Sequence, residues 1–172
     1  LENIEETRGA TAGAAVASCW AMSLLFDALR DLAELALGSR SCRTLGEDGP
    51  EELTEYASAM GGLVLVSGAG AALHVGVLAA PGDCARLARR LLGQPTSGHF
   101  PPSIVRGAMC ELAYLLGGGV KRRLNQVGEL SVGSPEFFEG AVRPHSGWVT
   151  RLTHVDIDQI RATLVSVARR DS

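Results

Sequence analysis

The sequence predicts an α+β fold, with about three helices packed against a largely antiparallel sheet built of hairpins. Two observations lead to this prediction. Segments that alternate apolar and polar residues come in pairs joined by short turns, as in β-hairpins. Segments with helical periodicity stand at the start and in the middle of the chain, which gives the order α-β-β-α-α-β-β-β. Because the strands come in hairpins rather than strand–helix–strand units, a parallel sheet is not expected.

The composition predicts a single domain over residues 1–172, of which residues 1–10 are expected to be flexible. The chain has 172 residues, 46% of them hydrophobic and 20% charged, and a formal net charge of −3. Such a chain is long enough to bury a substantial core. Its mild acidity argues against a nucleic-acid partner, because phosphate backbones select basic surfaces.

No membrane partner is expected either. The longest apolar run near the start, residues 14–26, is too short to span a bilayer. Acidic residues precede it, where a signal peptide would carry positive charge. The four cysteines are far apart and form no CxxC pair, which favours a reducing compartment. We therefore predict a cytoplasmic protein.

The first element is predicted to be a helix over residues 11–37. Thr11 can cap its N-terminus and Gly38 can end it. Its apolar side chains lie on several faces, which predicts burial on more than one side. Residues 38–53 are polar and rich in turn-forming types, so we predict a loop there.

A hairpin and a short helix are predicted next. Residues 61–80 have the pattern of two strands around the turn sequence SGAG. Residues 81–93 predict a short helix, with Pro81 at its start, Asp83 in its first turn and Gly93 at its end.

The second half of the chain is predicted to contain one long helix and two β segments. Residues 94–103 form a loop, with Ser103 placed to cap a helix that continues to Leu124. Residues 129–140 predict a strand with a bulged extension. Residues 147–170 alternate apolar and polar side chains as a closing hairpin does.

The long helix over residues 103–124 has an apolar stripe and an opposite polar face. Glycine costs about 1 kcal/mol relative to alanine in a helix, yet three glycines stand together at residues 117–119. A surface glycine lets another backbone approach closely, so we interpret the polar face as a docking surface. The alternative, that Gly118 packs against a neighbouring element of the same protein, stays open. At about 100° per residue, the apolar stripe is Val105, Met109, Leu112, Leu116 and Val120, and the polar face is Gly107, Glu111, Tyr114, Gly118, Lys121 and Arg122.

No other motif predicts catalysis or metal binding. The segment SGAGAAL has Leu73 where a dinucleotide-binding loop has its third glycine, and a strand is predicted to follow it. Asp156 and Asp158 lack the framework of a calcium loop and are predicted to lie in a solvated turn. The four histidines match no metal-binding pattern, and no serine lies in a nucleophile elbow.

The chain from Gly61 to Arg169 resembles the CheC/CheX/FliY family of chemotaxis phosphatases, most closely CheX. Members carry a helix of the form E-x-x-N-M-I-x-G-N-x-K. Here the strand–turn–strand–helix segment before this helix, and the strand and hairpin after it, also follow the family's order. The helical sequence ELAYLLGGGVK aligns with the motif at Glu111, Leu115, Leu116, Gly118 and Lys121.

The resemblance implies a partner and a reaction. Such proteins bind the receiver domain of a phosphorylated, CheY-like response regulator and speed hydrolysis of its aspartyl phosphate. The motif's glutamate contacts a receiver lysine, and its asparagine positions the attacking water. In this chain Glu111 occupies the glutamate position, whereas Tyr114 and Gly119 occupy the two asparagine positions.

The resemblance also implies the roles of particular residues and the assembly. Glu111 and Tyr114 are the candidate catalytic residues. The candidate partner-binding residues are Glu111, Gly118 and Lys121, which match the motif, and Gly107, which the polar face of the helix adds. No cofactor of its own is expected, because any magnesium would belong to the receiver. Members of the family commonly form dimers through the sheet, and the final hairpin here is strongly β-forming. The resemblance therefore implies a homodimer.

Three functions stay open at this point. The favoured one is a signalling domain that binds a receiver without hydrolysing its phosphate, because a phenol replaces the carboxamide at Tyr114. The second is an active aspartyl-phosphate phosphatase that uses Glu111 and Tyr114. The third is a non-catalytic dimerisation or scaffold module, like the flagellar switch proteins that share the fold.

Overall fold

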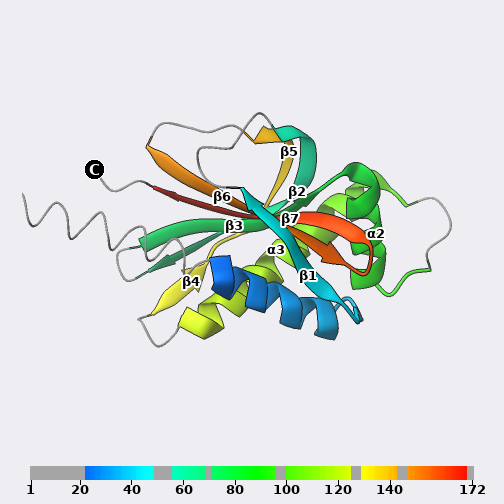
Figure 1. Cartoon of the computed structure of the whole chain (residues 1–172), viewed down its shortest axis with the longest axis horizontal. Helices are drawn as coiled ribbons and strands as arrows, with labels where there is room; N and C mark the ends of the chain where they lie inside the picture. Colours follow the sequence, from blue (N-terminus) through cyan, green and yellow to red (C-terminus); the bar gives the residue numbers. More distant parts are fainter. Residues whose placement is uncertain are drawn as a thin grey trace, which may run out of the picture.

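One antiparallel sheet and three helices make up the described part of the chain, which comprises residues 22–48, 56–68, 71–95, 100–124, 129–142 and 147–169 of the computed structural model (Figure 1). The predicted α+β fold is confirmed. The helices are a first helix over residues 22–35, α2 (Pro81–Leu91) and α3 (Pro102–Leu124). The strands are β1 (Cys42–Asp48), β2 (Tyr56–Gly68), β3 (Ala71–Ala79), β4 (Leu130–Val132), β5 (Glu136–Val142), β6 (Trp148–Ile157) and β7 (Ile160–Arg169).

The strands lie in the order β1-β6-β7-β3-β2-β4, and β5 also pairs with β2. The predicted hairpins over residues 61–80 and 147–170 are present as β2–β3 and β6–β7. Residues 129–140, predicted as one strand with a bulged extension, contain β4 and the start of β5. These two strands pair with opposite ends of β2. The final hairpin is therefore central in the sheet, and β1 and the β4–β5 segment form its two edges.

Two predictions of local structure are wrong. The loop predicted over residues 38–53 contains β1, which pairs with β6 at an edge of the sheet. Residues 43–46 of this strand are exposed, so it lacks the apolar alternation that marks a half-buried strand. α3 begins at Pro102, so Ser103 lies within the helix and is not its cap. Thr11, the predicted cap of the first helix, lies outside the described residues.

The main hydrophobic core lies between the helices and one face of the sheet. The first helix and α3 lie side by side along this face (Figure 1), and α3 packs on β2 and β3. Burying one leucine or valine side chain contributes about 1.5–3 kcal/mol, so this contact supplies most of the apolar stabilisation. Buried residues here include Leu25 and Leu29 of the first helix, Leu112 and Leu116 of α3, and Val75 and Leu164 of the sheet.

α3 approaches β2 so closely at Gly62 that no side chain fits between them. A Cβ atom built on Gly62 would lie 2.1 Å from the carbonyl oxygen of Met109 and 2.9 Å from the Cβ atom of Ala113. Non-bonded carbon atoms prefer separations of about 3.5–4.0 Å. The missing side chain at Gly62 therefore sets the distance between α3 and the sheet.

A two-residue turn joins β6 to β7 and contacts α2. Asp158 and Gln159 have φ angles of 47° and 68°, and a type I′ hairpin turn requires positive φ at both central residues. The Asp158 carboxylate accepts hydrogen bonds from the Arg90 side chain at 2.8 Å and from the Arg40 backbone amide at 3.1 Å. The turn that was expected to be merely solvated therefore ties the sheet to α2.

The Asp158 contact predicts a pH-dependent contribution to stability. The hydrogen bond from Arg90 lowers the pKa of the Asp158 carboxyl to about 2, against about 3.9 in an unfolded chain. The contribution is therefore complete above about pH 5 and is lost as the pH falls toward about 2. We expect Asp158→Asn to reduce the loss of stability over this range, because asparagine tolerates the same positive φ. Urea unfolding at several pH values checks this, and equal losses in both proteins would contradict it.

Candidate functional site

The two faces predicted for α3 are present in the structure. The five residues of the apolar stripe are all buried. On the opposite face, Gly107, Glu111 and Tyr114 are exposed, while Gly118 and Lys121 are half-buried. We call this set of five residues the docking face. Its exposure is established by the structure, whereas its role in binding stays a prediction.

The glycine run at residues 117–119 serves more than one purpose. A Cβ atom on Gly117 would lie 2.7 Å from Val64 of β2, and one on Gly119 would lie 3.0 Å from Ala28 of the first helix. These two glycines therefore allow close packing inside the protein. Among the described residues, a Cβ atom on Gly118 would meet only the Arg122 side chain, at 3.9 Å. The alternative, that Gly118 packs against one of the described neighbouring elements, is therefore wrong.

Gly107 and Gly118 leave open space on either side of Glu111 and Tyr114. Nothing lies within 4 Å of a Cβ atom built on Gly107. Tyr114 is 46% exposed, and it follows Glu111 by three residues, which places the two side chains on neighbouring turns of one helix face. Within the described ranges, neither side chain makes a hydrogen bond or an ion pair. The carboxylate and the phenol are therefore both available to a partner.

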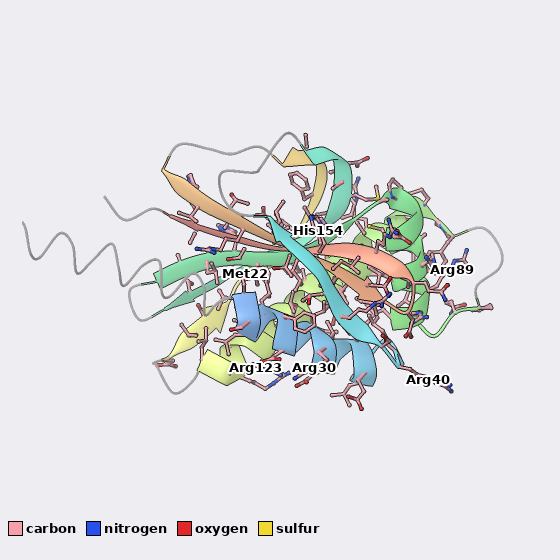
Figure 2. All side chains as sticks on the ribbon, in the orientation of Figure 1. Met22, Arg30, Arg40, Arg89, Arg123 and His154 are labelled. Carbon is pink, nitrogen blue, oxygen red and sulfur yellow. The ribbon has the colours of Figure 1, made fainter. Side chains whose placement is uncertain are left out.

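One side of the docking face is bordered by the first helix. Arg123 lies where α3 meets this helix (Figure 2). Its guanidinium donates to the carbonyl oxygens of Gly119 and Asp27, each at 3.2 Å, and forms an ion pair with Asp31. These contacts fix the C-terminal end of α3 against the first helix, and with it the direction in which the docking face points.

The other side of the docking face is bordered by β5, which sequence reasoning did not connect to the site. The Arg106 guanidinium lies 4.8 Å from the centre of the Phe137 ring. One of its nitrogens is 3.9 Å from a carboxylate oxygen of Glu139. Thirty residues separate Arg106 from β5, so no local sequence pattern predicts this contact. α3 and β5 therefore present a combined surface.

The cysteines in the described part of the chain are not suited to nucleophilic chemistry. Burial raises the pKa of the Cys84 thiol to about 12 and that of Cys42 to about 11. It also raises the pKa of Cys110, the neighbour of Glu111. A raised pKa disfavours the reactive thiolate. Cys84 instead donates a hydrogen bond to the Met60 carbonyl oxygen at 3.2 Å, as a buried structural thiol does.

A separate hollow of about 470 Å³ lies away from the docking face. Leu45, Leu78, His154 and Thr163 are among the residues that line it. His154 Nδ1 and the Thr163 hydroxyl are 3.1 Å apart, which is hydrogen-bonding distance across β6 and β7. This hollow contains neither Glu111 nor Tyr114, so its size alone does not make it the functional site.

Two further findings concern metals and membranes. Among the residues whose placement is described, no group of three or more His, Cys, Asp or Glu side chains could hold a metal ion. In the same part of the chain, no helix is long and apolar enough to cross a bilayer.

Comparison with known proteins identifies the fold. The sequence matches no protein-family model and no curated protein. A CheC-like superfamily protein from Shewanella sp. PV-4 is similar in structure, with a TM-score of 0.66, 14% sequence identity, and coverage of 88% of this chain and 97% of that one. A chemotaxis protein CheX from Desulfovibrio desulfuricans has a TM-score of 0.65 and 10% identity, over 87% of this chain and 96% of its own.

A third similar structure contains a partner. It is the CheX–CheY–BeF3–Mg²⁺ complex from Borrelia burgdorferi, whose matched chain has a TM-score of 0.62 and 12% identity, over 87% of this chain and 97% of that one. Identities this low establish the fold alone. Because the matches cover nearly the whole of each chain, the fold of this protein is that of the CheC/CheX-like proteins.

Proposed function

We propose that this chain is a bacterial two-component signalling domain that binds the receiver domain of a response regulator through the docking face of α3. The observation that carries the proposal is the open space at Gly107 and Gly118, on either side of Glu111, whose carboxylate has no partner among the described residues. A helix face without side chains at these positions lets a partner's backbone approach closely. The similar CheX–CheY complex supports a CheY-like receiver as the partner.

The charges on α3 suit such a partner. Glu111 is the acidic residue of the docking face, and the resemblance assigns to it a contact with a receiver lysine. Lys121 lies in the last turn of α3 together with Arg122 and Arg123. The resemblance implies that the receiver offers a lysine and a negatively charged phosphorylated aspartate. The proposal therefore matches each sign of charge on α3 with a group on the receiver.

We propose that this chain binds the receiver domain without hydrolysing its aspartyl phosphate. A carboxamide can donate to and accept from one water molecule at once, and the family motif uses asparagine in this way. Tyr114 occupies that position, and its phenol oxygen lies several ångströms further from the backbone. It would fill the place of the water rather than orient it. We also propose that any magnesium belongs to the receiver, and that the pair acts in the cytoplasm.

We predict that Gly118→Arg blocks receiver binding and leaves the fold intact. Arginine is a good helix former, so the free energy of unfolding should stay constant or rise by up to about 1 kcal/mol. Its long side chain would occupy the open space on the docking face, and we expect the Kd to rise about 10-fold or more, which corresponds to about 1.4 kcal/mol. Urea unfolding and titration with a beryllofluoride-loaded receiver measure the two effects.

Gly117→Arg is the matched control for stability. The Cβ atom there already meets Val64, so the substitution should overpack the core and destabilise the protein by about 1–3 kcal/mol or more. Equal destabilisation by the two variants would mean that Gly118 is also packed internally. Unchanged receiver binding by a stable Gly118→Arg protein would show that the partner binds elsewhere.

We predict that Tyr114→Asn creates phosphatase activity. The substitution restores the family's E-x-x-N spacing with Glu111, and positioning of a water is worth on the order of 10- to 100-fold in rate. The loss of phosphate from a phosphorylated receiver should therefore be faster with the variant than with the unmodified protein. The opposite pattern, in which the unmodified protein is active and Tyr114→Phe is not, would identify an active phosphatase that uses the phenol.

Homodimer formation is also part of the proposal, but not through the final hairpin. β6 pairs with β1 and β7 pairs with β3, so this hairpin has no free edge. A dimer joined by strand pairing must use an outer strand, and β1 is an outer strand that exposes Leu45. We expect light scattering to give twice the 18.0 kDa of one chain, and Leu45→Lys to give monomers, because edge lysines oppose strand pairing. A monomeric unmodified protein at micromolar concentration would contradict this.

A further inference from the structure

Arg106 stacks on an aromatic ring beside the docking face, and its one acidic neighbour among the described residues, Glu139, is 3.9 Å away. Its guanidinium lies 4.8 Å from the centre of the Phe137 ring, within the range of a cation–π contact. The ring itself is partly buried against the main core, so it is a rigid support. Stacking on an aromatic ring fixes the plane of a guanidinium, which a lysine ammonium cannot reproduce. Arg106 is therefore pre-organised more than an ordinary surface arginine.

Glu139, the acidic neighbour of Arg106, leaves most of the N–H donors of the Arg106 guanidinium unused. Glu139 is 3.9 Å away, which is beyond hydrogen-bonding distance. The two side chains are 62% and 61% exposed, and such a pair contributes little to stability because water screens it. A carboxylate from a partner can therefore replace Glu139 at little cost. A guanidinium has five N–H donors in a planar fork that matches a carboxylate.

The position of Arg106 links it to the docking face. It directly precedes Gly107 and lies five positions before Glu111, which corresponds to about 7.5 Å along the helix axis and about 140° around it. At about 100° per residue, Arg106 lies on the same flank of α3 as Gly117. This flank faces β4 and β5, because a Cβ atom on Gly117 would lie near Val132 of β4. A partner seated on the docking face would therefore meet Arg106 at its edge.

We propose that Arg106, held by Phe137, binds a carboxylate on the surface of the receiver domain and thereby selects which receiver this protein accepts. The inference rests on the proposed function, since it uses the same docking face. Glu111 requires a cation on the partner. Arg106 requires an anion on the partner, at a set distance from that cation. A receiver without an acidic side chain at that distance leaves the Arg106 guanidinium without a partner, which lowers its affinity.

The test compares variants of the whole chain in binding to CheY-like receivers of the same organism, each loaded with beryllofluoride and Mg²⁺. Arg106→Ala should raise the Kd of the preferred receiver about 5- to 20-fold, as expected for a charge-assisted hydrogen bond. Arg106→Lys should recover little of this loss, and Phe137→Leu should lose part of it with no change of charge. Arg106→Ala and Arg106→Lys should keep the unfolding midpoint of the unmodified protein. Phe137→Leu removes part of a ring that packs against the core, so its midpoint should fall, and its Kd is measured at a temperature at which the variant is fully folded.

Arg43→Ala is the matched control. Arg43 is also exposed, also lies 3.9 Å from its acidic neighbour Asp156, and belongs to β1 at the opposite edge of the sheet. The substitution removes the same charge, so the net charge of the protein changes equally. We expect less than a twofold change in Kd. Alanine replacement of the receiver's surface Asp and Glu residues should then find one whose effect does not add to that of Arg106→Ala.

Three outcomes would overturn the inference, and each has a different meaning. If Arg106→Ala matches Arg43→Ala while Gly118→Arg abolishes binding, the docking face stands and Arg106 has no part in it. If the Arg106→Ala effect disappears when beryllofluoride is omitted, the anion is the phosphoryl group and not a surface carboxylate. If the unmodified protein binds none of the receivers, the proposed function fails, and this inference fails with it.

Discussion

The close packing of α3 against both the sheet and the first helix is the constraint on which the rest of the structure depends. Three glycines make it possible: Gly62 where β2 meets the helix backbone, Gly117 beside Val64, and Gly119 beside Ala28. A helix in contact with neighbours on two sides cannot rotate about its axis without clashes. The same contacts that form the core therefore fix which residues of α3 face outward.

The candidate site is a consequence of this packing. Once Gly117 and Gly119 face inward, Gly118 between them must lie on the remaining side, in line with Glu111 and Tyr114 along the helix. Arg123 fixes one flank through Asp31, and the Arg106–Phe137 contact forms the other. The site therefore needs no loop to position it. As far as the structure describes it, the site is an exposed helix face, which suits recognition of another folded protein better than enclosure of a small substrate.

Sequence reasoning predicted the parts of the fold that have a periodic pattern. The two hairpins and the two faces of α3 follow from alternation and from the 100° period, because each has one buried and one exposed side. β1 escaped prediction because an edge strand with exposed side chains has no such contrast. The roles of Gly117 and Gly119 escaped it because their neighbours, Val64 and Ala28, are distant in sequence. The Arg106–Phe137 contact could not be predicted either, because it joins α3 to β5, which are also distant in sequence.

The three adjacent glycines of α3 all lower the stability of the helix, but they differ in which contacts offset this loss. Each costs about 1 kcal/mol relative to alanine. At Gly117 and Gly119 that cost is offset by the approach of buried apolar groups, which alanine would hold apart. At Gly118 no described contact offsets the cost, because in that part of the chain only the Arg122 side chain lies near it, at 3.9 Å. Alanine at this position would stabilise the isolated domain without a clash. Nothing within the described chain explains why glycine stands there, and the proposed docking of a partner backbone on α3 beside Glu111 would supply the reason.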